Sequence, residues 1–120
     1  AIAALETYDV VCVHVEAPDE ASHAADAKTK VAAIEAIDEH VVGPIHEALE
    51  AGGERWGGWR MLVLPDHFTR VDNRRHDPTP VPFLMAGTKV RSVVQRRFSE
   101  REAHASDLRV PRGHELMDYF

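Results

Sequence analysis

The chain has 120 residues, of which 44% are hydrophobic and 28% are charged, as in an ordinary single globular domain. Its formal net charge of −6 at pH 7 argues against a surface that binds nucleic acid. No apolar run approaches the roughly 18 residues of a membrane span, no secretory signal is visible, and the single cysteine, Cys12, suits a reducing compartment. We therefore expect a cytoplasmic protein that binds neither nucleic acid nor a membrane.

Residues 10–15 form the first apolar run, which is rich in β-branched side chains. The run lacks a clean alternation of apolar and polar residues, and this is typical of a buried strand in the centre of a parallel sheet. Within the run, we expect Cys12 to be a small core residue. We expect His14 to be a hydrogen-bonded residue of the core or of the sheet edge.

A helix is predicted from about residue 26 to residue 51. Its apolar residues recur every three or four positions, as on one face of an amphipathic helix. These residues are Val31, Ile34, Ile37, Val41, Ile45 and Leu49. The pair Gly52-Gly53 is a typical helix end. Pro44 has no backbone N–H to donate, so we expect a kink or a restart of the helix there.

The second half of the chain alternates short apolar runs with polar connections. Its predicted strands are residues 60–64, 81–86 and 90–98. The polar stretch 68–80 is predicted to be a long loop, Ser99 is expected to cap a helix, and residues 115–120 are expected to form a short terminal helix. The order strand, helix, strand, loop, strand predicts an α/β fold with a mostly parallel sheet flanked by helices.

Aspartate and histidine side chains follow each of the first two predicted strands. Asp19 and His23 are four residues apart, which places both on one face of a helical turn. Asp66 and His67 follow the second strand, and His76 lies in the loop beyond. Open α/β sheets bind ligands where their strands end. Carboxylates together with imidazoles suit divalent ions of the Mn or Zn type, and two such ions are a common arrangement for phosphoryl chemistry.

Other readings of these residues stay open at this stage. Each Asp/His pair taken alone is also typical of an exposed surface or a helix cap, and only their joint placement favours a metal site. A two-histidine, one-carboxylate iron site built on Asp19, His23 and His76 fits the same residues, as does a non-catalytic metal-binding module.

The remaining polar side chains give weaker signals. Arginine forks are good phosphate ligands, although polar loops are often arginine-rich for other reasons. The arginines of the predicted loop are Arg70, Arg74 and Arg75. Four further histidines show no partner pattern and are expected to be solvated. They are His40, His46, His104 and His114.

Several strings of the chain resemble a known family. They are Asp9 to His23 (DVVCVHVEAPDEASH), Leu64-Pro65-Asp66-His67, Arg74 and His76 followed by Pro80-Val81-Pro82-Phe83, Phe98-Ser99-Glu100, and Gly113 to Met117. In order and spacing they are similar to the C-terminal segment of archaeal-type 2,3-bisphosphoglycerate-independent phosphoglycerate mutases, which belong to the alkaline phosphatase superfamily. The resemblance covers nearly all 120 residues.

The resemblance implies a fold, a set of ligands and an incomplete site. Residues 1–120 would be the C-terminal half of a metal-binding, alkaline-phosphatase-like catalytic domain, without its N-terminal half or the inserted substrate domain. Asp19, His23 and His76 would hold one divalent ion, and Asp66 and His67 the other. We expect manganese, with zinc, cobalt and magnesium as alternatives. The family's serine nucleophile would lie upstream, so no catalytic residue is expected on this chain.

The activity implied for the full-length protein is the interconversion of 3- and 2-phosphoglycerate in glycolysis through a phosphoserine intermediate. The chain alone is expected to be inactive, and to associate either with the missing N-terminal part or with itself. Three departures from the family pattern leave a metal-dependent hydrolase of phosphate esters or phosphonates as the alternative. One of them is Ser22, which stands where glycine is frequent. Residues 68–70 read Phe-Thr-Arg where Pro-Thr-Pro is usual, and Arg75 stands where threonine is usual.

Overall fold

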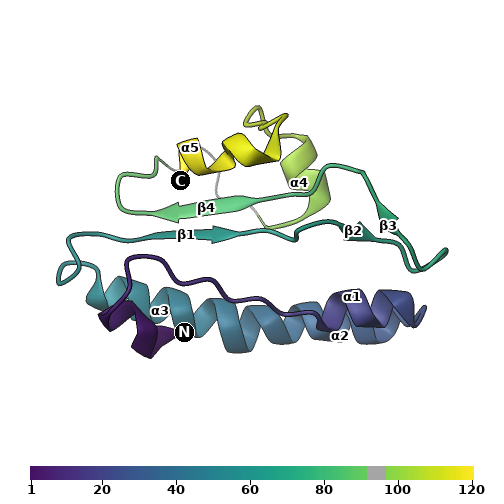
Figure 1. Cartoon of the computed structure of the whole chain (residues 1–120), viewed down its shortest axis with the longest axis horizontal. Helices are drawn as coiled ribbons and strands as arrows, with labels where there is room; N and C mark the ends of the chain where they lie inside the picture. The colour runs from purple at the N-terminus through teal and green to yellow at the C-terminus, as the bar shows by residue number, and fades with distance from the viewer. Residues whose placement is uncertain (92–96) are drawn as a thin grey trace.

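The computed structural model describes residues 1–91 and 97–120, and it arranges the chain in three tiers (Figure 1). The first tier is helical, the second is a pair of strands, and the third holds the short C-terminal helices. In chain order the elements are η1 (Ile2–Glu6), α1 (Ala17–His23), α2 (Ala27–Ile37), η2 (Asp38–Val42), α3 (Gly43–Gly52), β1 (Arg60–Val63), β2 (Phe68–Thr69), β3 (His76–Asp77), β4 (Leu84–Gly87), α4 (Glu100–His104), η3 (Gly113–Glu115) and α5 (Leu116–Tyr119).

The helix predicted over residues 26–51 is confirmed, and α2, η2 and α3 follow one another without a break. Asp26 caps its start, because the Asp26 carboxylate accepts from the amide of Thr29 at 2.9 Å. The interruption predicted at Pro44 is a π turn, in which the amide of Gly43 bonds to the carbonyl of Asp38, five residues back. The wider turn accommodates a proline ring that would otherwise clash with the carbonyl four residues before it.

The strands predicted near residues 60–64 and 81–86 are confirmed as β1 and β4, but their pairing is antiparallel. Arg60 lies opposite Gly87 and Val63 opposite Leu84. The predicted, mostly parallel sheet is therefore not found in the described residues, which form two small antiparallel sheets beside the helices. The reason lies in the connection between β1 and β4. A parallel pair needs a crossover, usually a helix, whereas residues 64–83 contain only loop and a short hairpin.

The prediction of a strand at residues 10–15 is wrong. This segment is unpaired, and no backbone hydrogen bond to it is found within the described part of the chain. Cys12 is exposed rather than part of the core. His14 is also exposed and lies 3.5 Å from the carboxylate of Glu16. The apolar run has the composition of a buried strand, but the described residues supply no neighbouring strand to pair with it.

The long loop predicted at residues 68–80 contains a hairpin. Its strands β2 and β3 place Phe68 opposite Asp77 and Thr69 opposite His76. The amide of Arg70 donates to the carbonyl of Arg75 at 3.0 Å and continues the ladder. Strands of two residues carry no periodic pattern, and this is why the polar composition alone indicated a loop.

The buried core of the described residues is small. Its hydrophobic members are Ala21, Leu49 and Leu116. The radius of gyration is 15.4 Å, against about 13.6 Å for a compact domain of this length. On the helix predicted to face a core, Val31 and Ile34 remain 56% and 51% exposed. The chain therefore carries apolar surface that its own described residues do not cover.

The C-terminal predictions are partly tested. Ser99 caps α4 by accepting from the amide of Glu102, and the short terminal helix is α5. The edge strand predicted at residues 90–98 falls largely on residues 92–96, which lie outside the described ranges. Among the described residues, no helix has both the length and the apolar character needed to cross a membrane.

Candidate metal centre

Helix α1 carries the first two predicted ligands. Asp19 lies in its first turn and His23 is its last residue, so the predicted helical turn is confirmed. On the rest of the helix, Ala21 is 4% exposed and Ser22 is fully buried, with its hydroxyl donating to the carbonyl of Pro18 at 2.7 Å. These small side chains let α1 lie close to its neighbours, while the side chains of Asp19 and His23 remain partly exposed.

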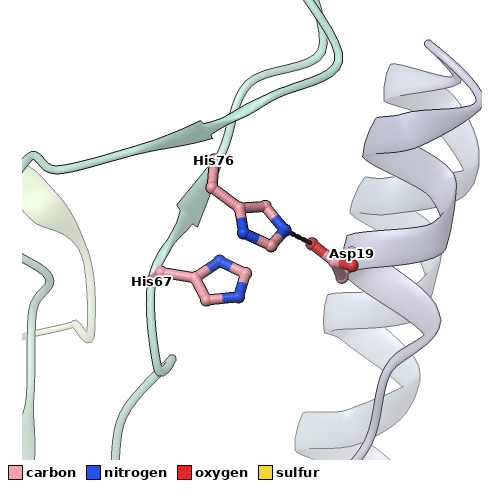
Figure 2. A group of neighbouring side chains, drawn as sticks. All are labelled: Asp19, His67 and His76. Carbon is pink, nitrogen blue, oxygen red and sulfur yellow. Dashed lines mark ion pairs between the residues drawn. The ribbon is translucent and has the colours of Figure 1, made fainter.

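The β2–β3 hairpin and the loop before it bring two further histidines to α1. His67 immediately precedes β2, and His76 begins β3. Their rings stack with centroids 3.8 Å apart and planes 30° apart. Figure 2 shows both imidazoles beside Asp19, with Nε2 of His76 directed at the carboxylate. Residues about fifty positions apart in the chain thus meet at one surface.

Metal-binding atoms of three residues converge at short distances. Nε2 of His23 lies 3.3 Å from Oδ2 of Asp19 and 3.2 Å from Nε2 of His76, and Nε2 of His76 lies 3.6 Å from Oδ1 of Asp19. Bonds of about 2.1 Å in a tetrahedral site imply about 3.4 Å between neighbouring ligand atoms. A looser group overlaps this one, because atoms of Asp19, His67 and His76 lie within 4.8 Å of one another. The shorter distances are closer to the spacing that one ion requires.

The hydrogen bond on the far side of the His23 ring determines which nitrogen faces the cluster. Nδ1 of His23 lies 2.9 Å from the carbonyl oxygen of Arg74. A carbonyl oxygen only accepts, so Nδ1 must carry the proton. Neutral His23 therefore presents the lone pair of Nε2 to Asp19 and His76. A backbone carbonyl in this position is a common outer partner of a metal-binding histidine.

Asp66 lies at the edge of the cluster. Its Oδ2 is 3.4 Å from Nε2 of His67, its Oδ1 accepts from the His67 amide at 3.0 Å, and its side chain is 69% exposed. The structure thus brings Asp19, His23, His67 and His76 together, and leaves Asp66 in contact with His67 alone among these residues. The division of the five residues between two separate ions stays a prediction.

Sequence reasoning missed Thr69. This residue is 5% exposed, and its hydroxyl donates to Oδ1 of Asp19 and lies 3.2 Å from Nδ1 of His67. The pKa of Asp19 is lowered, chiefly because Thr69 donates to the carboxylate, with smaller contributions from the nearby histidines. Thr69 follows His67 by two positions into a strand, where alternate side chains share a face. The sequence indicated a loop at these positions, so it gave no signal of this alternation.

The other polar candidates lie outside this cluster. The four histidines predicted to be solvated are exposed, and one of them, His46, packs edge-on against Trp59 at 5.6 Å. Arg70 bonds to both carboxylate oxygens of Asp72 and lies 3.8 Å from Asp77, so its guanidinium is engaged within the hairpin. Phosphate binding by Arg74 or Arg75 stays a prediction.

The donor set fits a divalent transition ion. One carboxylate and several imidazoles within a few ångströms suit Mn²⁺, Zn²⁺ or Co²⁺, whereas Mg²⁺ and Ca²⁺ favour sites built mainly of oxygen. The cluster is also open to solvent, because His23 and His76 are 44% and 55% exposed. A metal ion would therefore reach it in this chain without a conformational opening.

The comparisons with known proteins agree with this chemistry. The chain is 43% identical over 117 residues to a 2,3-bisphosphoglycerate-independent phosphoglycerate mutase of Methanothrix thermoacetophila, and the match spans 98% of this chain and 29% of that protein. It is 42% identical over 118 residues to such a mutase, numbered 2, of Methanothermobacter thermautotrophicus, with 98% and 28% covered.

A probable mutase of the same type from Geobacter sulfurreducens is 41% identical over 119 residues. The chain spans less than a third of the length of these curated relatives. No solved structure matches it. The model of the Metalloenzyme superfamily matches residues 1–119. With that match over nearly its whole length, the chain belongs to the Metalloenzyme superfamily.

Proposed function

We propose that this chain is part of a divalent-metal-dependent phosphoglycerate mutase that interconverts 3- and 2-phosphoglycerate through a phosphoserine intermediate. The protein would act in glycolysis in the cytoplasm, and its metal would be manganese. The relatives named as such mutases, at 41 to 43% identity over nearly this whole chain, support the substrate class.

One observation carries the proposal: the convergence of Asp19, His23 and His76. The Nε2 atoms of His23 and His76 lie 3.2 Å from each other, and each lies 3.3 to 3.6 Å from an oxygen of Asp19. The Arg74 carbonyl holds the proton of His23 on the opposite side of the ring. Lone pairs directed at one another repel unless a proton or a cation lies between them, and in this proposal a metal ion takes that place.

The proposed ligand assignment uses all five predicted residues. Asp19, His23 and His76 would hold one ion, while Asp66 and His67 would contribute to a second. Bound ions would supply positive charge beside a phosphoryl group. The residues of this chain would hold the ions through neutral imidazoles and ionised carboxylates, at a surface that a phosphate ester can reach. The serine nucleophile would come from a part of the protein outside these 120 residues.

The proposal also accounts for the uncovered apolar surface. Val10 is 71% exposed, and Val31 and Ile34 are more than half exposed. The relatives are more than three times as long as the matched segment. We infer that the remainder of such a longer protein covers these residues, and that it completes an alkaline-phosphatase-like domain.

A chimaeric enzyme tests the proposal. These 120 residues would replace the matching segment of the Methanothrix thermoacetophila relative, and mutase activity would be followed by formation of 2-phosphoglycerate with and without Mn²⁺. We expect Mn²⁺-dependent turnover that is lost in the His23→Ala chimaera and kept in a His40→Ala control, because His40 is an exposed histidine outside the cluster.

Three outcomes would contradict the proposal. A chimaera that folds by circular dichroism but has no activity would exclude the mutase role. Turnover that survives chelation of the metal would show that activity does not depend on the proposed metal centre. Release of inorganic phosphate without formation of 2-phosphoglycerate would favour the hydrolase alternative.

A further inference from the structure

Thr69 connects the hairpin to both neighbouring helices. Its hydroxyl bonds to Asp19 on α1, and its carbonyl accepts from Nζ of Lys30 on α2 at 2.8 Å. The same hydroxyl lies 3.2 Å from Nδ1 of His67. Thr69 and Ser22 are the two buried polar residues among those described. A buried hydroxyl between two proposed metal ligands is in a position to orient both.

Counting protons gives these contacts a direction. A threonine hydroxyl has one proton to donate and lone pairs to accept with. An ionised carboxylate only accepts, and Thr69 donates to Asp19. The hydroxyl proton is therefore committed to Asp19, so the contact with His67 requires Nδ1 of the imidazole to donate. The chain of hydrogen bonds then runs from His67 through Thr69 to Asp19.

This direction has a consequence for His67. A neutral imidazole carries a proton on one of its two nitrogens, so a proton on Nδ1 leaves Nε2 with a free lone pair. That nitrogen lies 3.4 Å from Oδ2 of Asp66. Two electron-rich atoms at this distance suit a shared cation better than a direct contact. The Thr69 hydroxyl thus acts on one ligand from each of the two proposed ion sites.

We infer that Thr69 is a positioning residue of the metal centre, whose hydroxyl holds Asp19 and fixes His67 in the tautomer that leaves Nε2 free to bind a metal ion. The inference rests on the proposed metal site and deepens it. If the hydroxyl only filled space, Thr69→Val would leave the site unchanged, because valine has nearly the same shape as threonine. The role of the hydroxyl is therefore separable from that of the side chain's volume.

The first measurement is the tautomer of His67 in the metal-free chain. Nitrogen-15 NMR of the imidazoles at about pH 8 distinguishes a proton on Nδ1 from one on Nε2 in neutral histidine. The His67 signals are assigned by their loss in His67→Gln. We expect the Nδ1–H form in the wild type and in Thr69→Ser. In Thr69→Val we expect a shift toward the Nε2–H form.

The second measurement is Co²⁺ affinity by titration of the visible absorption of the bound ion. Removing an outer partner of a metal ligand commonly weakens binding by about 10 to 100-fold. We expect that loss in Thr69→Val and near-wild-type affinity in Thr69→Ser. Thr79→Val is the matched control, because the Thr79 hydroxyl donates to Asp77 on the same hairpin but does not contact the cluster. We expect its tautomer and affinity to match the wild type.

Several results would overturn the inference. An Nε2–H tautomer of His67 in the wild type would do so without any variant. Equal Co²⁺ affinity in the wild type and Thr69→Val would also overturn it. So would a loss of Co²⁺ affinity in Thr69→Ser as large as the loss in Thr69→Val. A wild-type chain that binds no Co²⁺ would instead overturn the proposed metal centre, and the tautomer comparison would still decide whether Thr69 orients His67.

Discussion

Nδ1 of His23 donates to the carbonyl of Arg74, 51 residues further along the chain, at 2.9 Å. Arg74 reaches this position in a left-handed backbone conformation, with φ of 59°. The contact fixes the ring of a proposed ligand from behind, and it depends on the backbone of Arg74 rather than on the side chain. The side chain and the backbone of this residue can therefore be tested separately.

Replacement of Arg74 by glycine should keep the turn and leave Mn²⁺ affinity unchanged. A left-handed residue with a side chain costs about 1 to 2 kcal/mol, while glycine's extra freedom in the unfolded chain costs roughly 0.5 to 1 kcal/mol. We expect a net gain of up to about 1 kcal/mol in the free energy of unfolding, measured by urea denaturation of the metal-free chain. Weaker Mn²⁺ binding would show that the Arg74 side chain itself takes part in the site.

Replacement of His23 by alanine should weaken Mn²⁺ binding at least about tenfold, because a direct ligand matters no less than an outer partner. Isothermal titration measures this on the purified chain. His40→Ala is the control, since His40 is exposed on η2 and is not one of the clustered residues. Equal losses in both variants would mean that binding is not localised at the cluster.

The N-cap of α2 should make stability depend on pH. Hydrogen bonds from the side chain and the amide of Thr29 lower the pKa of Asp26. A carboxyl group whose pKa is lower in the folded state stabilises the fold above its unfolded pKa, and this contribution is lost as pH falls through the folded pKa. Asp26→Asn keeps a capping oxygen but has no charge.

We therefore expect the wild type to be more stable than Asp26→Asn near pH 7, and the difference to shrink as the pH falls below the ordinary aspartate pKa and through the lowered pKa of folded Asp26. Urea denaturation with the metal removed by a chelator gives both free energies. A difference that is constant across this range would show that the charge of Asp26 does not contribute.

Gly87 should tolerate no side chain. It has φ of 129°, and an added Cβ would lie 2.2 Å from the carbonyl oxygen of Trp59. Gly57 provides the control, because it also has positive φ, at 74°, but nothing lies within 4 Å of its Cβ position. Gly87→Ala should therefore cost more than Gly57→Ala, and more than about 1 kcal/mol. Equal costs would indicate that the backbone conformation alone is responsible.

The purified 120-residue chain should not interconvert phosphoglycerates, even with Mn²⁺. The cluster supplies metal ligands, and loss of a covalent nucleophile typically costs about six orders of magnitude in rate. A coupled mutase assay is the measurement, and the active chimaera proposed above is the positive control. Sustained turnover by the chain alone would place the nucleophile within these residues.

Signals local in the sequence predicted much of this structure. The 3.6-residue period located the long helix, Pro44 located its interruption, and the four-residue spacing placed Asp19 and His23 on one turn. Ser99 was identified as a cap from its position before a helical run. Each of these features depends on residues within about one helical turn of one another, where spacing and geometry are directly linked.

What the sequence could not predict depends on partners distant in the chain. The run at residues 10–15 has the composition of a buried strand, yet a strand also needs a neighbour, and the described residues offer none. The antiparallel pairing of β1 with β4 depends on the path between them. Thr69 was overlooked because its role arises only when the hairpin meets α1, fifty residues away in sequence.

The proposed ligands lie on separate parts of the chain, and this gives an ion a mechanical effect as well as a chemical one. His23 and His76 are 53 positions apart, so an ion bound by both would cross-link α1 to the hairpin and close a long loop. An ion that binds only the folded chain also raises its stability in proportion to the logarithm of its concentration. Bound Mn²⁺ would then hold α1 and the hairpin together and add stability that the small core of this chain does not provide.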